Sequence, residues 1–324
     1  MKFISNVFHC IVYISLFFGS HLADNIENDL LDDDDFNLVK KDDYIIKGLN
    51  WFGFETQYFN LMCTWAHDIE WHIEKIDELG FNYIRLPFSV EFTEKEEWKD
   101  MDEFFEKIQY YNIDVALDCH RLHSTHQSAK PYDNYVSFDD FLESWRTILS
   151  RYVDVPNLKA VDIFNEYQSD NYVEWNSIAR QTLEYLEYHF PGRFKYFVGG
   201  TNWGGSLHYV NLEDLFFKDR ISYTVHKYWF SDSDPYEDKW DYSFADLDLP
   251  VVNIGEWGYK SESLQETTWA EKFVDFLKEK SLTDTFFWTY SFNSIDTGGI
   301  LLYDCTSVDE DKMALLHKLW TPNR

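Results

Sequence analysis

The sequence lacks several features that would place it in common protein classes. It contains no Asn-x-Ser/Thr motif for N-glycosylation, and no linker rich in Gly, Ser or Pro interrupts it from Tyr44 onward. Basic residues are also scarce, since 28 Lys and Arg stand against 58 Asp and Glu, a formal net charge of -30 at pH 7. A polyanion gains nothing from counterion release at phosphates, which argues against nucleic acid and anionic membranes as partners. We therefore expect one folded domain that acts on a neutral partner.

Cysteine is rare as well. The chain has Cys10, Cys63, Cys119 and Cys305, and the first of these lies in a predicted signal peptide. The remaining three are an odd number, so at most one disulfide forms and at least one thiol stays free. The cysteines are therefore not a framework that defines the fold, and the pairing is left open.

Residues 1–23 have the layout of a secretory signal peptide. One Lys precedes an apolar stretch from Val7 to Phe18, small residues follow, and cleavage is expected between Gly19 and Ala23. The stretch is short of the ~20 apolar residues that span a membrane. Residues 24–43 are acidic and aperiodic, which is typical of a disordered linker or a pro-segment. We expect a secreted protein with no membrane attachment after cleavage.

From residue 44 to residue 324, strand-like runs alternate with amphipathic helical patterns. With 45% hydrophobic and 19% aromatic residues, the chain can bury a large core. The predicted strands cover residues 45–52, 82–88, 114–120, 160–165, 195–200, 221–228, 251–255 and 286–291. Such alternation predicts a parallel sheet with crossover helices, and eight units favour a (β/α)8 barrel, in one catalytic domain. An open doubly wound sheet usually has a Gly-rich phosphate loop after its first strand, and "GLNWFGFET" is not one.

Polar residues stand at the C-terminal end of one predicted strand after another. In a (β/α)8 barrel these ends gather on a single rim, where functional groups lie. The residues are Arg85, His120, Asn165 with Glu166, His226 with Tyr228, Glu256, and Trp288. Two carboxylates among such neighbours suit the hydrolysis of a glycosidic bond, in which one carboxyl donates a proton and the other stabilises or attacks the sugar.

The motifs "GFNYIRLPFS", "LDCHR", "FNEYQ", "VHKYW", "IGEWG" and "FFWTYSFNSIDTGGIL" resemble the successive strand-end motifs of family 5 glycoside hydrolases, the cellulase family. The stretches "NWFGFET" and "DTGGIL" resemble its bacterial-type endoglucanases most. The resemblance runs from about Ile45 to Trp320, in the order of the family.

The resemblance implies a role for each rim residue. Glu166 would be the acid/base and Glu256 the nucleophile of a retaining enzyme. Asn165 would bind the 2-hydroxyl of the sugar, Tyr228 would hold the nucleophile with Arg85 nearby, Trp288 would lie beneath the sugar, and His120 and His226 would line the site. The family usually has Pro after the acid/base, whereas this chain has Tyr167, which changes the loop on the leaving-group side.

Further aromatic residues lie at or just past strand ends, where rings can stack on flat β-linked glucose units. They are Trp51, Tyr132, Trp175, Trp203, Trp229 and Trp257. For each, packing between loops is an equal alternative, and we expect substrate contact at Trp203.

The histidines of "HRLHSTH", His120, His123 and His126, also admit a metal site, because imidazole is a common zinc ligand. Their spacing in a loop sets no geometry, so we expect one active-site histidine, two loop residues, and neither a metal nor a cofactor.

We therefore expect a secreted, monomeric, retaining endo-β-1,4-glucanase that hydrolyses a β-glucan. The nearest alternative is a hydrolase of another β-glycan, namely mannan, xyloglucan, mixed-linkage glucan or β-1,3-glucan. A carbohydrate-binding barrel without catalysis is a third alternative, although both glutamates and their neighbours are present.

Overall fold

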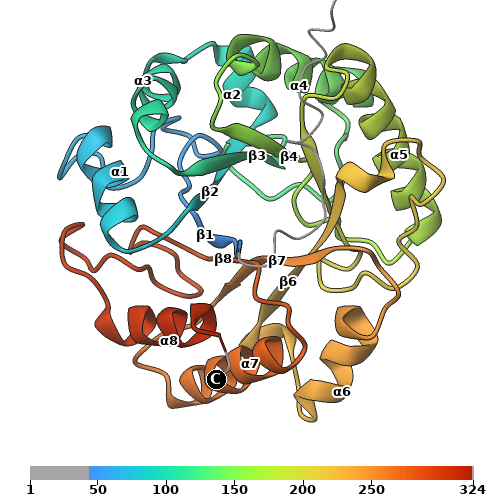
Figure 1. The fold of residues 1–324 in the computed structure, drawn as a ribbon. Coiled ribbons are helices and arrows are strands. Elements are labelled where there is room, and N and C mark those ends of the chain that lie inside the picture. The colour runs from blue at the N-terminus through green and yellow to red at the C-terminus, as the bar shows by residue number, and fades with distance from the viewer. Residues whose placement is uncertain (1–43, 323–324) are drawn as a thin grey trace, which may run out of the picture. The chain divides into compact units, whose positions relative to one another are not determined.

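The structure is a computed structural model that describes residues 44–322, and its strands form one closed barrel. The strands are β1 (Lys47–Asn50), β2 (Tyr83–Ser89), β3 (Asp114–Arg121), β4 (Leu158–Asp162), β5 (Lys195–Gly199), β6 (Ile221–Tyr228), β7 (Val252–Gly258) and β8 (Thr285–Phe287). All neighbours in the ring are parallel, and β1 pairs with β8 to close it (Figure 1). The predicted (β/α)8 fold is confirmed. The expected signal peptide and the acidic segment lie outside the described residues.

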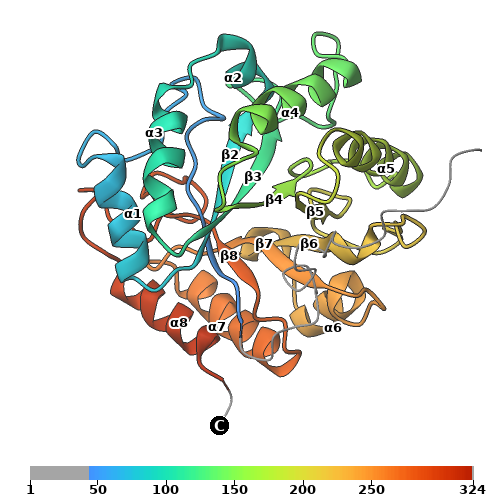
Figure 2. The same cartoon turned by 45° about the horizontal axis from the view of Figure 1, so that its top comes forward.

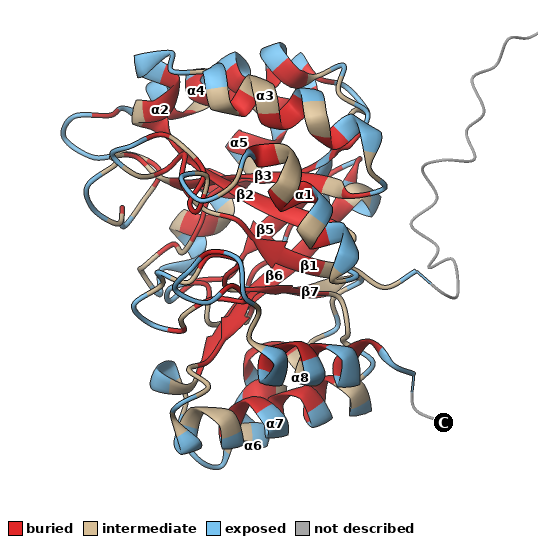
Figure 3. Ribbon diagram, turned by 90° about the vertical axis from the view of Figure 1, so that its left-hand side faces the viewer, coloured by how far each residue is buried: buried red, intermediate tan, exposed pale blue. Residues whose placement is uncertain are grey.

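Helices surround the barrel, as the tilted view shows (Figure 2). They are α1 (Ile69–Glu78), α2 (Val90–Lys95), α3 (Lys99–Lys107), α4 (Phe138–Tyr152), α5 (Tyr172–His189), α6 (Tyr236–Trp240), α7 (Leu264–Glu279) and α8 (Glu310–Trp320). The strands are largely buried, while the helices alternate between buried and exposed residues (Figure 3). Gly80 follows α1 and has φ +84°, a left-handed conformation that glycine adopts without strain. Such a glycine commonly ends a helix.

Side chains that point into the barrel come from alternate strand positions. Tyr83, Ala116, Ala160, Phe197 and Phe286 form an apolar cluster there, separate from the larger core between strands and helices. The ring of Phe286 lies where a Cβ on Gly48 would be, at 2.3 Å from its Cδ1, so glycine makes room for it. Two residues further along three of these strands, the inward positions are Arg85, Asp118 and Asp162, which are polar.

The strand boundaries differ from the prediction at two important places. β4 ends at Asp162 rather than residue 165, and β8 ends at Phe287 rather than residue 291. The chain nevertheless keeps bonding to its neighbours beyond both ends: Asn165 N donates to Cys119 O at 3.0 Å and Trp288 N to Trp257 O at 2.7 Å. The polar residues after the strands therefore remain at the rim.

Cys63 and Cys305 form a disulfide, and Cys119 is free and buried. This agrees with the prediction of at most one disulfide and at least one free thiol. The bond joins the loop after β1 to the loop after β8, where the barrel closes, and bridges a sequence separation of 242 residues. Among the residues described, no helix has the length and apolar character that crossing a membrane requires.

The disulfide should stabilise the barrel by restricting the unfolded chain. We predict that replacing Cys63 and Cys305 by Ala lowers the free energy of unfolding by about 2 to 5 kcal/mol. The Tm, measured by calorimetry, should fall by roughly 5 to 15 °C. A reductant should lower the Tm of the wild type and leave that of the double variant unchanged. Equal Tm values for wild type and double variant would contradict this role.

Candidate active site

The guanidinium of Arg85 is the centre of the polar layer above the apolar cluster. It is fully buried and forms ion pairs with Asp118 Oδ1 (3.1 Å), Asp162 Oδ2 (2.8 Å) and Glu256 Oε1 (2.6 Å). It also donates to Asn50 Oδ1 and Asn165 Oδ1, both at 2.9 Å. One cation therefore links side chains from β1, β3, β4, the segment after β4, and β7.

A β-bulge directs Glu256 into the site. Val225 of β6 pairs with Ile254, but the next pair is His226 with Glu256, so Gly255 is an extra residue on β7. A Cβ at Gly255 would lie 2.3 Å from Thr224 Oγ1, so any other residue would require the Thr224 side chain to move. Bulges commonly redirect a side chain next to an active site, and here the bulge places Glu256 beside Arg85.

Glu166 lies opposite Glu256, in the segment that follows β4. A carboxylate oxygen of each glutamate and a ring nitrogen of His226 lie within 4.8 Å of one another. His226 Nδ1 is 3.1 Å from Glu166 Oε1 and 3.6 Å from Glu256 Oε2. The two predicted catalytic carboxylates are therefore neighbours across one imidazole.

The surroundings push the pKa values of the two glutamates in opposite directions. Burial raises the pKa of Glu166, and the negative charge of Glu256 adds to the effect, while His226 and Arg85 oppose it. At Glu256 burial acts the same way, but His226, Arg85, His120 and a hydrogen bond from Tyr228 outweigh it and lower its pKa. The Tyr228 hydroxyl donates to Glu256 Oε2 at 2.8 Å. One carboxyl is thus prepared to hold a proton and the other to stay ionised.

The remaining predicted site residues lie around this pair. His120 Nδ1 is 2.6 Å from Asp118 Oδ2 and its Nε2 is 3.3 Å from Asn165 Nδ2, while burial keeps the pKa of His120 well below its usual value. Its ring stacks on the partly exposed Trp288 at 5.3 Å, and Trp288 also stacks on Phe52 at 5.8 Å. The predicted residues therefore meet at the rim, and their roles stay predictions.

The other aromatic residues divide into two groups. Trp51, Trp175 and Trp257 are completely buried, so of the two alternatives left open by the sequence, packing applies to them. Trp203, in the loop after β5, is 48% exposed, and its amide donates to the carbonyl of Tyr167, next to Glu166. Trp203 therefore remains available to a substrate, as do the partly exposed Tyr132 and Trp229.

Three site residues escaped the analysis of the sequence. Asn50, Asp118 and Asp162 all bind Arg85, yet each stands inside an apolar run that reads as an ordinary strand. Burial raises the pKa of both aspartates to about 7, although Arg85 opposes it. The sequence did contain a signal for the two aspartates. Carboxylates are expensive to bury, so an Asp within an otherwise apolar strand indicates a partner in the core.

A cavity of about 670 Å³ lies beside the active site rather than in it. Its lining comes from the loop before α4 and from the first turns of α4 and α5, and includes Tyr132, Asp133 and Glu174. Neither Glu166 nor Glu256 borders it. The predicted site residues converge instead at the two glutamates on the rim.

Comparison with known proteins gives a consistent result. The family model of the cellulases, glycosyl hydrolase family 5, matches residues 39–294. An endoglucanase of Paenibacillus polymyxa is 25% identical over 331 residues, which cover 85% of this chain and 82% of the relative.

Two solved structures resemble the barrel. The catalytic domain of the major endoglucanase of Xanthomonas campestris has a TM-score of 0.77 and 26% identity, with 86% of this chain and 95% of that chain covered. A cellotetraose complex of the endocellulase of Pyrococcus horikoshii has a TM-score of 0.77 and 26% identity, with coverage of 86% and 93%. The chain therefore belongs to glycosyl hydrolase family 5, the cellulase family.

Proposed function

We propose that this protein is a retaining endo-β-1,4-glucanase that uses Glu166 as acid/base and Glu256 as nucleophile. The observation that carries the proposal is the closeness of the two carboxylates, because one oxygen of each lies within 4.8 Å of the other, next to His226. Retaining glycosidases hold their carboxyl groups ~5 to 5.5 Å apart, whereas inverting ones need ~6.5 to 9.5 Å for a water molecule.

The substrate assignment is supported by the relatives. Those with similar sequences are named endoglucanases, and the Pyrococcus horikoshii endocellulase binds cellotetraose in variants with a glutamate replaced by alanine. A β-1,4-linked glucan chain is therefore the substrate that we propose here.

The reaction takes place in two displacements. The Glu256 carboxylate forms a bond to the anomeric carbon while the bond from that carbon to the leaving oxygen breaks, and the leaving oxygen takes the proton of Glu166. The negative charge of Glu256 is one cause of the raised pKa of Glu166. Glycosylation removes this charge and so lowers the pKa of Glu166. Glu166 then accepts a proton from water, whose oxygen attacks the same carbon and releases Glu256. Glu256 is held for attack by Arg85 and Tyr228.

We also propose that the enzyme is secreted and monomeric. One relative is named as an extracellular endoglucanase, and the first 23 residues have the layout of a signal peptide.

Stereochemistry tests the proposal directly. We predict that the first sugar released from cellotetraose is the β-anomer, because two inversions at one carbon restore its configuration. Proton NMR during the first minutes, before mutarotation, measures it. An initial α-anomer would rule out Glu256 as a nucleophile, and faster cleavage of β-mannan than of carboxymethyl-cellulose would reassign the substrate.

Chemical rescue separates the two glutamates. We predict that Glu166→Ala still forms the glycosyl-enzyme from an activated aryl β-cellobioside, because a good leaving group needs no proton, but hydrolyses it slowly. Azide should then restore turnover and yield a β-glycosyl azide, detected by NMR. Glu256→Ala should yield no β-glycosyl azide. The opposite behaviour of the two variants would show that the roles are exchanged.

Trp288 should act on the transition state rather than on folding. Its partly exposed ring lies at the end of β8 beside His120, where it can shield the reacting sugar and meet the positive C–H edge of that sugar. We predict that Trp288→Ala lowers kcat and kcat/KM by ~10 to 1,000-fold, a loss of ~1.4 to 4 kcal/mol.

The Tm should change little, and Trp288→Phe, which keeps an aromatic face, should lose less activity. A Trp288→Ala variant with wild-type kcat and a Tm several degrees lower would identify the ring as core packing instead.

A further inference from the structure

A miniature hairpin after β3 holds two histidines side by side. Residues 123 and 126 form an isolated antiparallel β-bridge, and Ser124 and Thr125 make the turn between them. Paired residues of a hairpin present their side chains on the same face. The rings of His123 and His126 accordingly stack, with centroids 4.9 Å apart and planes at 20°. His120 is not part of this pair, since it lies in the active site.

Asp133 completes the group from the far side of the same loop. Its Oδ2 is 2.7 Å from His123 Nε2, and its Oδ1 accepts hydrogen bonds from the amides of Tyr135 (2.7 Å) and Val136 (2.9 Å). The two amides thus hold the carboxyl group in place, with its other oxygen turned toward the histidines.

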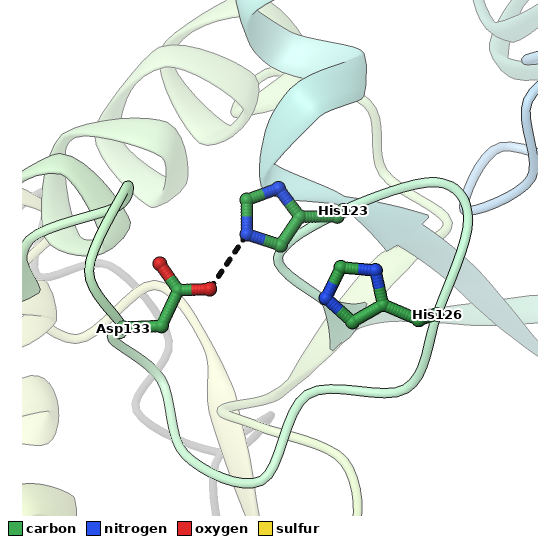
Figure 4. Close-up of side chains that lie close together, drawn as sticks. All are labelled: His123, His126 and Asp133. Carbon is green, nitrogen blue, oxygen red and sulfur yellow. Dashed lines mark hydrogen bonds and ion pairs between the residues drawn. The ribbon is translucent and has the colours of Figure 1, made fainter.

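One donor atom from each of His123, His126 and Asp133 lies within 4.8 Å of the other two. Figure 4 shows the three side chains converging, with a ring nitrogen of His126 turned toward the other two residues. The other ring nitrogen, His126 Nδ1, is 3.2 Å from Thr125 Oγ1. In metal-ligating histidines, a hydrogen bond at the ring nitrogen that does not bind the metal fixes the orientation of the ring.

We propose that His123, His126 and Asp133 form a zinc-binding site. Two imidazole nitrogens and one carboxylate oxygen are ligands that Zn²⁺ accepts at ~2.0 to 2.2 Å, with a water molecule completing a tetrahedron. Such bonds place donor atoms about 3.4 Å apart, so small side-chain rotations suffice, and the ion replaces the hydrogen bond between His123 and Asp133. His126 and Asp133 are exposed, which leaves a path for entry.

The ion would join two parts of the loop between β3 and α4, namely the hairpin that carries His123 and His126 and the segment that carries Asp133. The turn of the hairpin is already anchored, because Ser124 N donates to Glu91 Oε2 at 2.9 Å. Further along the same loop, Ala129 contacts the segment that follows Glu166, because Gln168 N donates to Ala129 O at 3.1 Å. Zinc would thus stiffen the leaving-group side of the active site, which is a structural role.

A competing site must be separated from this one. Glu166, His226 and Glu256 also bring three ligand atoms within 4.8 Å, so a titration with metal alone does not identify the binding residues. The test is calorimetric titration of the full chain, produced without a histidine tag and stripped with a chelator, with ZnCl₂. We expect one bound ion, and an affinity at least about tenfold lower in His126→Ala and in Asp133→Asn. Asp133→Asn keeps an oxygen for the two amides.

Two control variants make the result specific. His189→Ala removes an exposed histidine of α5, and Glu256→Gln alters the competing site, so both should retain the wild-type affinity. Zinc should also raise the Tm of the wild type by a few degrees at saturating concentration and leave that of His126→Ala unchanged. Co²⁺ bound at the site should give visible absorption bands that His126→Ala abolishes.

Three outcomes would overturn the proposal: no zinc uptake by the wild type, loss of binding in Glu256→Gln with retention in His126→Ala, or equal loss in His189→Ala. The second would assign the ion to the active site, and the third to scattered surface histidines.

Discussion

The buried guanidinium of Arg85 is the interaction on which the geometry of the rim depends. It contacts three carboxylates and two amide oxygens that come from β1, β3, β4, β7 and the segment after β4. Its planar fork of donors can satisfy several acceptors at fixed angles, which the single ammonium of lysine cannot do. Removing a buried partner of this kind leaves charges uncompensated, so Arg85 couples the stability of the barrel to the position of Glu256.

The excess of acids around Arg85 also explains how the charge is distributed. One cation cannot neutralise three carboxylates at such short range, and burial raises the pKa of Asp118 and Asp162 to about 7. Glu256 has additional stabilisation from His226, His120 and Tyr228, so it takes the charge. The layer below is apolar and gives the aspartates no solvent. In the proposed reaction, the negative charge is therefore concentrated on the atom that attacks.

The sequence predicted the barrel and the residues of its rim because both depend on local regularities. Alternation of strands and helices identifies the fold, and a polar residue after an apolar run marks a strand end. The bulge at Gly255 depends on pairing with β6, and the roles of Asp118 and Asp162 depend on an arginine from another strand. Trp51, Trp175 and Trp257 look like rim residues by position alone, but all three are completely buried. Trp51 packs on Phe104 of α3 and Trp257 on Phe273 of α7, whereas Trp175 belongs to α5 and donates to the carbonyl of Gly199 in β5. Likewise, only the spatial closeness of the loops after β1 and β8 pairs Cys63 with Cys305.

The departure at Tyr167 follows the same logic of contacts between loops. Where the family usually has proline, the Tyr167 hydroxyl donates to Glu174 Oε2 at 2.8 Å and its ring stacks on Trp175 at 5.0 Å. Glu174 also accepts from Lys130 and Tyr132, both at 2.6 Å, and these three hydrogen bonds lower the pKa of Glu174 to about 2. A proline would restrict the backbone after Glu166 by itself, whereas here side chains from three segments hold it. The segment after Glu166 and the loop between β3 and α4 are therefore held together by these contacts. An ion bound to that loop would consequently influence the position of Glu166.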